Sequence, residues 1–407
     1  MVFNVYDLGV EKKGTKENTD FSEYKTKKYT DEELLMVKHN EPINTCPNAV
    51  FDVSDYTEDD IVLLIDGDWL TFSATSNEME RFITCNIDGE CIEFSGYNKY
   101  KEYLKSLGRV DEYSVENCIK GQRNKELFIS LGNIKRKVGS LIEKTKANKV
   151  IIALGCIDNK RLYLPLPKYK GRYKAQRGSE WIPETLPEAK EWTRKKWVSW
   201  WSVGKETDDD VTIIFHSLLD KGVKVYLCGI DKDYNQEHYG GLYLIGHHEE
   251  PTWYDNTEEN ALGFLKLVDR EVIDRKTKKG SGKYTSDVKG HGDMFLAYQI
   301  LSEDSADNYS GKSFLKEFGD KKTFSDKEVV KLLSKCKSRK ELWQTVFDTF
   351  KKHLPESFEY ISWDDKVIKS SPLHAVDLFY KCACMMKHQG FEANIVDLFD
   401  ELGVDYD

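Results

Sequence analysis

The chain has 407 residues, 40% of them hydrophobic, which is enough to bury one large core or two ordinary ones and excludes a disordered protein. No stretch approaches the ~20 uninterrupted apolar residues of a membrane span, and the N-terminus lacks the charged-then-apolar order of a signal peptide, so we expect a cytoplasmic protein without a membrane partner. The net charge of −10 argues at first sight against a nucleic-acid partner, which normally shows as an excess of Lys and Arg.

The N-terminal segment, residues 1–58, is polar and shows no sustained apolar period, so we interpret it as a peripheral arm with one candidate short helix at 31–37. The apolar run at 61–65 then has the pattern of a buried strand, and it ends abruptly at Asp66. Nine cysteines are spread singly along the chain without a CxxC pair, which predicts free thiols rather than a zinc site.

Two further apolar runs, at 149–155 and 223–228, each follow a helix-like stretch, at 125–145 and 209–219. Strands that alternate with helices predict an α/β fold with a central, mainly parallel sheet. In such sheets ligands bind beyond the carboxyl ends of the strands. An acidic residue follows each of the three predicted strands there, and these residues are Asp66, Asp158, Asp231 and Asp233.

The connections carry turn signals of two kinds. Residues 82–94 have the pattern of an inserted β-hairpin around the Asp88-Gly89 turn, and the Gly-, Ser- and Lys-rich segment 276–292 predicts a mobile loop. Beyond Ser325 the periodicity becomes helical, with Pro372 as a helix-start signal. Helices are expected at 326–336, 340–353 and 372–389.

A basic strip interrupts the otherwise acidic chain. Seven basic residues and no acidic residue lie between positions 160 and 177. They are Lys160, Arg161, Lys168, Lys170, Arg172, Lys174 and Arg177. The strip is consistent with phosphate contacts, and a solvated lysine-rich face is the alternative interpretation.

Acidic residues gather in two further segments. Glu206, Asp208 and Asp209 precede an apolar run, where helix capping is the alternative interpretation; Asp304 and Asp307 lie in a segment that could be only a turn. Mg²⁺ prefers oxygen ligands, and clustered carboxylates are electrostatically costly without cations. The joint order of these segments therefore predicts metal-assisted phosphate chemistry more strongly than any one of them does.

These segments resemble the motifs of the 5′-nucleases, that is, flap endonucleases and 5′-to-3′ exonucleases, most closely those of short-tailed lytic phages. The first motif is DGDWL at 66–70. The second consists of Asp158 and Arg161, followed either by YKGR at 169–172 or by YKAQR at 173–177, directly after it. The other three are ETDD at 206–209, DKD at 231–233 and DSADN at 304–308. The family usually has glycine where Glu303 stands, and Asp210 leaves the register of ETDD open by one residue.

The resemblance implies a PIN/5′-nuclease-like fold with a helical DNA-binding region, and an enzyme that hydrolyses phosphodiester bonds of DNA in phage replication, recombination or host DNA degradation. It implies two Mg²⁺ ions, with Mn²⁺ as a substitute, and substrates such as duplex DNA with 5′ ends or flaps and RNA:DNA hybrid. The implied metal ligands are Asp66, Asp158, Glu206, Asp208, Asp209, Asp231, Asp233, Asp304 and Asp307. Arg161 and either Lys170 or Lys174 would act at the scissile phosphate, with nucleic-acid contacts from Lys168, Tyr169, Arg172, Tyr173 and Arg177.

The expected organisation has four parts. They are an arm at 1–58, an α/β core at 59–270 with a hairpin insertion at 82–94 and a helical gateway at about 160–200, a loop and metal-binding region at 271–325, and a C-terminal helical region at 326–407.

Other interpretations of the function stay open at this point. They are a non-catalytic nucleic-acid-binding protein with the same fold, a HAD-type phosphatase suggested by the two aspartates of DGDWL, and a PIN-like ribonuclease.

Overall fold

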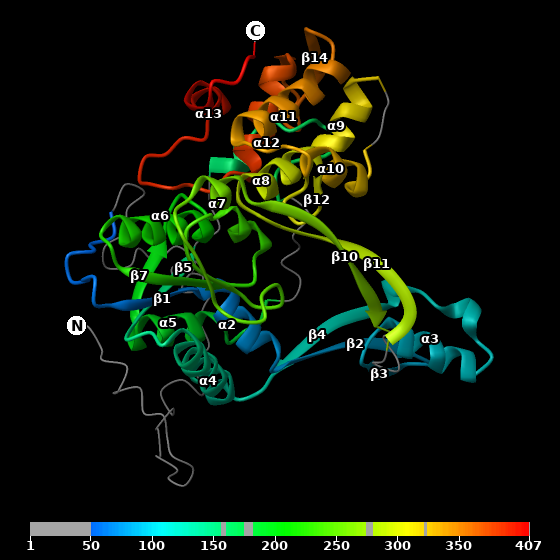
Figure 1. Ribbon diagram of the computed structural model, residues 1–407. Coiled ribbons are helices and arrows are strands. Elements are labelled where there is room, and N and C mark those ends of the chain that lie inside the picture. The colour runs from blue at the N-terminus through cyan, green and yellow to red at the C-terminus, as the bar shows by residue number, and fades with distance from the viewer. Residues whose placement is uncertain (1–49, 156–159, 175–181, 274–279, 321–323, 407) are drawn as a thin grey trace.

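The computed structural model describes residues 50–155, 160–174, 182–273, 280–320 and 324–406 (Figure 1). The helix expected at 31–37 lies outside these ranges, as do Asp158 and Arg177. No helix in the described ranges is long and apolar enough to cross a membrane.

A six-stranded sheet forms the centre of the molecule, in the order β6-β5-β1-β7-β8-β9, and all neighbours pair in parallel except β8 and β9. The strands are β1 (Ile61–Asp66), β5 (Lys149–Gly155), β6 (Val198–Ser202), β7 (Lys224–Gly229), β8 (Gly240–Leu244) and β9 (Thr252–Tyr254). This confirms the predicted mainly parallel α/β sheet. After β1 the chain adds β5 and β6 on one side of β1, and it then adds β7, β8 and β9 on the other side. β1 and β7 therefore flank the switch point, where parallel sheets bind ligands.

Alternation along β1 sets the two faces of the sheet. Leu63 and Ile65 pack against one layer of helices, α2 (Gly67–Ser76), α4 (Leu127–Thr145) and α5 (Leu186–Lys196). Val62 and Leu64 pack on the other side, against α6 (Thr207–Asp220). All four strand residues are fully buried, which explains why the strand has an uninterrupted apolar sequence.

A small antiparallel sheet projects from the core as an arm (Figure 1). It comprises β2 (Met79–Ile87), β3 (Glu90–Phe94) and β4 (Cys118–Asn124), with α3 (Tyr97–Ser106) and the short 3₁₀ helices η3 (Val110–Glu112) and η4 (Val115–Asn117). Asp88 and Gly89 both have positive φ, 56° and 87°, as the predicted type I′ turn requires.

The expectation that all cysteines are free is wrong for one pair in this arm. Cys85 and Cys118 face each other across β2 and β4 and form a disulfide. The other cysteines in the described ranges, at 91, 228, 336, 382 and 384, are free thiols. The arm has only a small core of its own around Ile83 and Tyr100, and small cores are commonly supported by a cross-link.

The mobile loop expected at 276–292 is wrong for residues 280–291. These residues form β11 (Gly280–His291), which pairs with β10 (Phe264–Ile273) in a long antiparallel hairpin. Backbone pairing tolerates the Gly, Ser and Lys residues because most of β11 is exposed. Figure 1 shows the hairpin leaving the base of the helical region and extending on the same side as the β2–β4 arm.

The helical gateway expected at about 160–200 is helical only in part. The described residues contain the short 3₁₀ helix η5 (Lys160–Tyr163) and then α5, which packs on the sheet through Ala189 and Trp192. Lys195 and Lys196 lie in its last turn. A second 3₁₀ helix, η6 (Lys232–Gln236), and the short α7 (Glu258–Leu262) connect the core to the hairpin.

The C-terminal region packs around its own hydrophobic cluster, centred on Phe314, Trp343 and Phe379. Its elements are α8 (Gly292–Leu301), β12 (Glu303–Asp304), β13 (Tyr309–Ser310), α9 (Gly311–Phe318), α10 (Asp326–Leu333), α11 (Arg339–His353), β14 (Phe358–Ile361), β15 (Val367–Ser370), α12 (Pro372–Ala383) and α13 (Ile395–Leu402). The predicted start at Pro372 is confirmed, with Ser371 accepting a hydrogen bond from the backbone of His374. The expected end near 389 is wrong, because the chain leaves the helix at Cys384 and turns back onto the core.

Candidate metal centre

Two acids lie where the central strands end. Asp66 closes β1, and its Oδ1 accepts hydrogen bonds from the backbone N of Asp68 and Trp69 at 3.1 and 3.2 Å. Asp231 follows β7 and accepts from the backbone N of Asp233 at 3.0 Å. Both residues therefore cap the turn after their strand, as the alternative interpretation supposed, and both also stand at the switch point of the sheet.

The start of α6 brings a second set of acids to the same edge. Glu206 is the N-cap residue, but its carboxylate makes no capping bond; it accepts from Arg161 Nη1 at 2.6 Å and pairs with Lys174. Asp208 accepts a hydrogen bond from the hydroxyl of Tyr234 at 3.0 Å. Helix capping therefore does not account for the Glu206 carboxylate.

The electrostatics of these acids show that they converge. Burial, together with repulsion by the carboxylates of Asp68 and Asp231, raises the pKa of Asp66 to about 7. Burial raises the pKa of Asp208 well above its ordinary value, with added repulsion from Asp231 and Asp66. We call Asp66, Asp208 and Asp231 the first carboxylate group.

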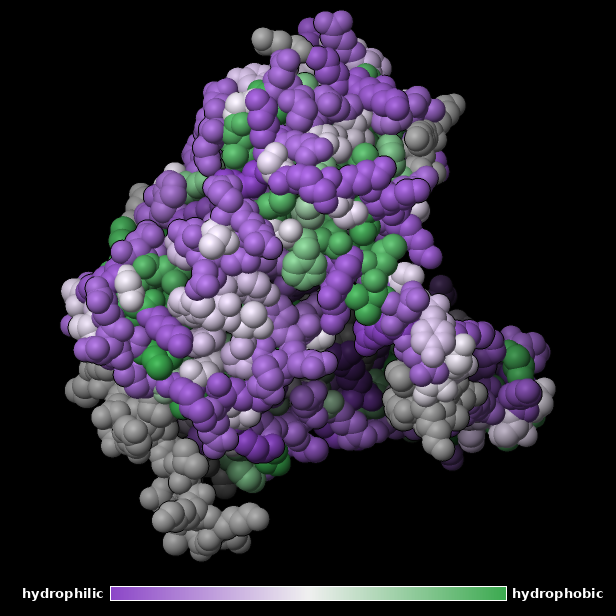
Figure 2. Space-filling model, in the orientation of Figure 1, coloured by the Kyte–Doolittle hydropathy of each residue, from purple (hydrophilic) through white to green (hydrophobic). Residues whose placement is uncertain are grey.

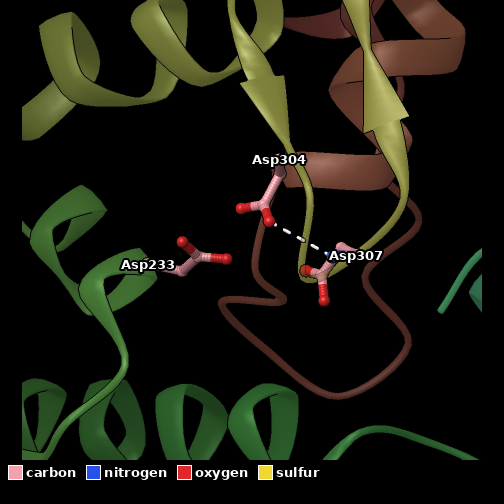
Figure 3. Close-up of side chains that lie close together, drawn as sticks. All are labelled: Asp233, Asp304 and Asp307. Atoms are coloured by element: carbon pink, nitrogen blue, oxygen red, sulfur yellow. Dashed lines mark hydrogen bonds between the residues drawn. The ribbon is translucent and has the colours of Figure 1, made fainter. Parts of the chain in front are cut away.

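A second carboxylate group lies beside the first. Carboxylate oxygens of Asp233, Asp304 and Asp307 all lie within 4.8 Å of one another, and all three residues are buried (Figure 3). Asp304 Oδ1 accepts from the backbone N of Ala306 and Asp307 at 2.8 and 3.1 Å, so the predicted turn is real and aims the side chains together. Burial raises the pKa of Asp233, and Asp231 is the acid that adds most to this shift.

Asp231 therefore acts on both groups, because it repels Asp66 and Asp208 on one side and Asp233 on the other. The donor set is wholly carboxylate oxygen, which fits hard divalent cations such as Mg²⁺ or Mn²⁺. Two adjacent oxygen-rich groups with a shared acid suit a pair of ions.

Arg161 lies inside the cluster, where its donors are taken by carboxylates and a carbonyl. It forms a two-point pair with Asp209, at 2.7 and 2.8 Å, and Nη2 also donates to the carbonyl of Cys384. Its expected role at a scissile phosphate stays a prediction. Burial acts to raise the pKa of Glu206, but Arg161 and Lys174 outweigh it and hold that pKa below its ordinary value. Arg161 thus fixes Glu206 and Asp209.

The structure distinguishes the two candidate lysines. Lys174 pairs with Glu206 and lies 3.5 Å from Asp307 Oδ1, so its ammonium group sits at the carboxylate cluster. Lys170 instead pairs with Glu303 at 2.9 Å, at the edge of the site. The choice that the sequence left open therefore favours Lys174.

The expected nucleic-acid contacts divide into exposed and buried residues. Lys168 and Tyr169 are exposed. Arg172 lies between the rings of Tyr163 and Trp363, at 5.2 and 5.6 Å from their centroids. Tyr173 is only 1% exposed and donates to Asp307 Oδ2 at 3.1 Å, so it supports the metal centre and is not placed to stack on a base.

Several supporting residues were not found from the sequence. Asp68 accepts from Lys190 Nζ and Thr207 Oγ1, both at 2.5 Å, and Gln299 donates to Asp233 Oδ1 at 2.6 Å. Lys232 Nζ lies 2.6 Å from Asp304 Oδ2. Asp68, Thr207 and Lys232 stand within motifs, whereas Lys190 and Gln299 carry no local signal because their partners are far away in the sequence.

No protein-family model and no curated protein sequence matches the chain. Solved structures do match it. A bacteriophage T5 protein co-crystallised with metal ions has a TM-score of 0.39 at 12% identity, covering 72% of this chain and 80% of that chain. The T5 5′-exonuclease with bound zinc has a TM-score of 0.38 at 14% identity, with the same coverage. A T5 flap endonuclease in complex with DNA and metal ions has a TM-score of 0.36 at 13% identity, covering 72% and 80%.

These names agree with the family that the sequence motifs resemble. Because the TM-scores and identities are low, we draw the function from the carboxylate geometry and the motif order of the chain itself.

Proposed function

We propose that the chain is a divalent-metal-dependent 5′-nuclease that hydrolyses phosphodiester bonds in DNA, with Mg²⁺ as its ordinary ion and Mn²⁺ as a substitute. The observation that carries the proposal is the buried group of Asp233, Asp304 and Asp307, with the first carboxylate group beside it at the switch point of the sheet. The 5′ polarity, and activity on flaps and on RNA:DNA hybrid, come from the motif resemblance.

The two groups divide the binding of the ions. Asp66, Asp208 and Asp231 would hold one ion, and the Asp233, Asp304 and Asp307 group would hold the other. Bound ions of this kind supply an activated water and neutralise the charge that develops on the phosphate. Asp158 belongs to the same proposed set, although it lies outside the described residues.

The residues around the ions have separate tasks. Lys174 carries a positive charge at the cluster, where a preorganised cation stabilises the charge of a transition state most effectively. Arg161 holds Glu206 and Asp209 in place, and Tyr234 orients Asp208 through its hydroxyl. Burial of Asp233, Asp304 and Asp307 limits bulk water at that group.

The direct test uses one duplex and one flapped DNA, each labelled at the 5′ or the 3′ end, with Mg²⁺ or with EDTA. We expect Mg²⁺-dependent release of mononucleotides or short fragments from the 5′ end. If the folded protein leaves both substrates intact with Mg²⁺ and with Mn²⁺, the proposal is wrong and a nucleic-acid-binding protein with this fold becomes the better interpretation.

Asp208→Asn tests the metal centre itself. Since Asp208 is crowded by Asp231 and Asp66, removing its charge leaves the fold intact and weakens ion binding. We expect cleavage to fall by ~10²- to 10³-fold, the range seen when one preorganised electrostatic group of an active site is removed. Asp220→Asn, at the other end of α6, is the matched control and retains wild-type activity. Wild-type cleavage rates in Asp208→Asn would exclude this metal assignment.

A further inference from the structure

One face of the β10–β11 hairpin contributes no ligand to the metal centre described above. Alternate residues of a strand share a face, so Phe264, Lys266 and Val268 point to the same side of β10. On the opposite face Leu265 is buried in the C-terminal hydrophobic cluster, which anchors the base of the hairpin. The face that carries Phe264 and Lys266 is thus turned away from the C-terminal cluster.

Two lysines stand directly opposite each other on this face. Lys266 is the cross-strand partner of Lys289 in the antiparallel register. Like charges in this position destabilise a sheet. In the described part of the chain neither ammonium group forms an ion pair with a carboxylate, whereas nearer the tip Arg270 and Asp287 lie 3.5 Å apart. The base of the hairpin therefore carries a concentrated positive charge that lacks an internal counterion among the described residues.

The same face lines a cavity of about 870 Å³ that reaches the metal centre. Its wall includes Phe264, Lys266 and Lys289 from the hairpin, Asp304 of the second carboxylate group, and Lys232, the ion-pair partner of Asp304. Figure 2 shows the molecular surface hollowed between the hairpin and the body of the molecule. A chain lying in this cavity would pass directly from the hairpin lysines to the carboxylates.

The positive charges of the cavity affect the pKa values of two neighbouring histidines. Burial lowers the pKa of His247, and the ammonium groups of Lys289 and Lys232 lower it further, against the opposing carboxylate of Asp231. Burial lowers the pKa of His248 as well, with Lys289 among the contributing charges. Lys289 and Lys232 therefore act on one space that borders the metal centre.

We propose that the face of the β10–β11 hairpin carrying Phe264, Lys266 and Lys289 binds a single-stranded segment of the nucleic-acid substrate and leads it to the second carboxylate group. This inference rests on the proposed nuclease function and adds a substrate-binding site to it. The backbone phosphates would supply the missing counterions of Lys266 and Lys289.

Phe264 decides between single-stranded and duplex nucleic acid. Its side chain is 42% exposed beside the lysines, and Lys266 Nζ lies 5.4 Å from the centroid of its ring. Exposed aromatic rings in basic grooves bind unpaired bases by stacking, whereas the bases of a duplex already stack on each other. The combination of an exposed ring and two unpaired ammonium groups therefore fits a single strand.

The test measures binding of a fluorescent oligothymidylate and of a blunt duplex in the Asp208→Asn background with Mg²⁺, at several salt concentrations. The hairpin variant is Lys266→Gln with Lys289→Gln, which removes both charges and also removes their mutual repulsion, so it should melt no lower than its parent. The matched control is Lys335→Gln with Lys337→Gln, which removes two exposed charges from the turn after α10. Phe264→Leu tests the stacking contribution separately.

We expect the hairpin variant to bind the single strand about 10-fold more weakly than the control, and the log–log salt slope to become shallower by about 1.4, the value for two lost phosphate contacts on single strands. Phe264→Leu should weaken single-strand binding without changing the salt slope. Duplex affinity should be nearly unchanged in both variants. Single-strand affinity and slope equal to those of the control would overturn the proposal, and an equal loss for duplex would overturn its single-strand assignment.

The outcome is separable from that of the proposed function. If the wild-type protein cuts DNA but the hairpin variant binds like the control, only the hairpin site is rejected. If the wild-type protein never cuts DNA but the hairpin variant loses single-strand binding, the hairpin site stands and the nuclease activity is rejected.

Discussion

At the scale of single residues, Asp66 combines two tasks that oppose each other. It caps the turn after β1, which any Asn or Asp can do, and it stands among acids that raise its pKa to about 7. Because the folded protein holds a proton on Asp66 more tightly than the unfolded chain does, the contribution of this residue to stability falls as the pH rises from about 4 through about 7.

Asp66→Asn should remove this pH dependence and keep the cap. Without divalent metal, we expect the unfolding free energy of the variant to increase relative to that of the wild type as the pH rises through this window, by at most about 1.4 kcal/mol per pH unit. Above pH 7 the difference between the two proteins should become constant. The measurement is denaturant unfolding of both proteins in EDTA at pH 4.5 to 8.5.

The buried His238 and His291, whose pKa values burial lowers to about 4, titrate alike in both proteins and cancel in this comparison. Asp59→Asn, at an exposed position, is the control and should show no such trend. A stability difference that is constant over the whole range would contradict the crowding of Asp66.

The two lysines of the basic strip predict different effects. Lys174→Met removes the ammonium group at the cluster, and we expect cleavage to fall on the order of 100-fold because a preorganised charge is lost from the transition state. Lys170→Met removes only one of the two lysines that pair with the partly exposed Glu303, the other being Lys312 at 3.8 Å, so its effect should stay within a few-fold. Single-turnover rates of the two variants at saturating enzyme make the comparison, and a larger loss for Lys170→Met would reverse the assignment.

How far the site could be predicted depends on where each partner lies in the sequence. Asp66 and Asp231 each follow a strand, and Asp304 starts a local turn, so their positions follow from short-range patterns. The partners of Arg161 lie 45 and 48 residues away, and its carbonyl contact at Cys384 lies 223 residues away. No local pattern encodes such contacts, so these partners of Arg161 could not be predicted from the sequence.

At the scale of elements, the β2–β4 arm depends on the Cys85–Cys118 cross-link. The closed loop has a sequence separation of 33 residues, for which the loop-entropy model gives about 4 kcal/mol as an upper estimate. We expect Cys85→Ser with Cys118→Ser to increase hydrogen exchange within the arm and leave the central sheet protected. Cys91→Ser, at an exposed free thiol, is the control.

The cross-link itself can be checked by non-reducing peptide mapping, which should find Cys85 and Cys118 in one linked pair of peptides. Rapid alkylation of both thiols in unreduced protein would contradict it. A cytosol keeps most thiols reduced, so the mapping should use protein that is alkylated at lysis as well as protein purified in air.

Elements were predictable where one face is buried and not where both faces are exposed. The run at 61–65 and the helix at α4 have strong apolar patterns because they pack on the sheet. β11 pairs through its backbone with few buried side chains, so its Gly-, Ser- and Lys-rich sequence looks like a loop. The end of α12 was placed too late, because hydrogen bonds of Met386 with Asp209 and Thr212 draw the chain away from the helix.

At the scale of the whole molecule, the acidic net charge of −10 and a nucleic-acid substrate are compatible. Part of the acidity is concentrated in the two carboxylate groups, where the proposed metal ions would neutralise it, and the lysines of the hairpin and the strip lie around that centre. Repulsion among unneutralised acids should make the metal-free protein less stable than the metal-bound protein.

Mg²⁺ should therefore stabilise the folded state. At a concentration 100 times the dissociation constant, one bound ion contributes about 2.7 kcal/mol, which raises the melting temperature by several degrees. Asp208→Asn with Asp233→Asn should lose most of this shift, since one ligand of each group is removed. NaCl of equal ionic strength is the control, and a wild-type shift no larger than that in NaCl would argue against a metal centre.

The return of the chain at residues 384–386 also has a consequence for how the protein matures during translation. The carbonyl of Cys384 and the backbone N of Met386 hydrogen-bond to Arg161 and Asp209, the pair that supports the start of α6. Ribosomes add roughly 5 to 20 residues per second, so the last strand of the central sheet, β9, emerges many seconds before Met386 is made. A nascent chain can thus fold its sheet while the contacts that hold Arg161 and Asp209 are still incomplete, so the proposed activity would begin only after the late helices have been synthesised.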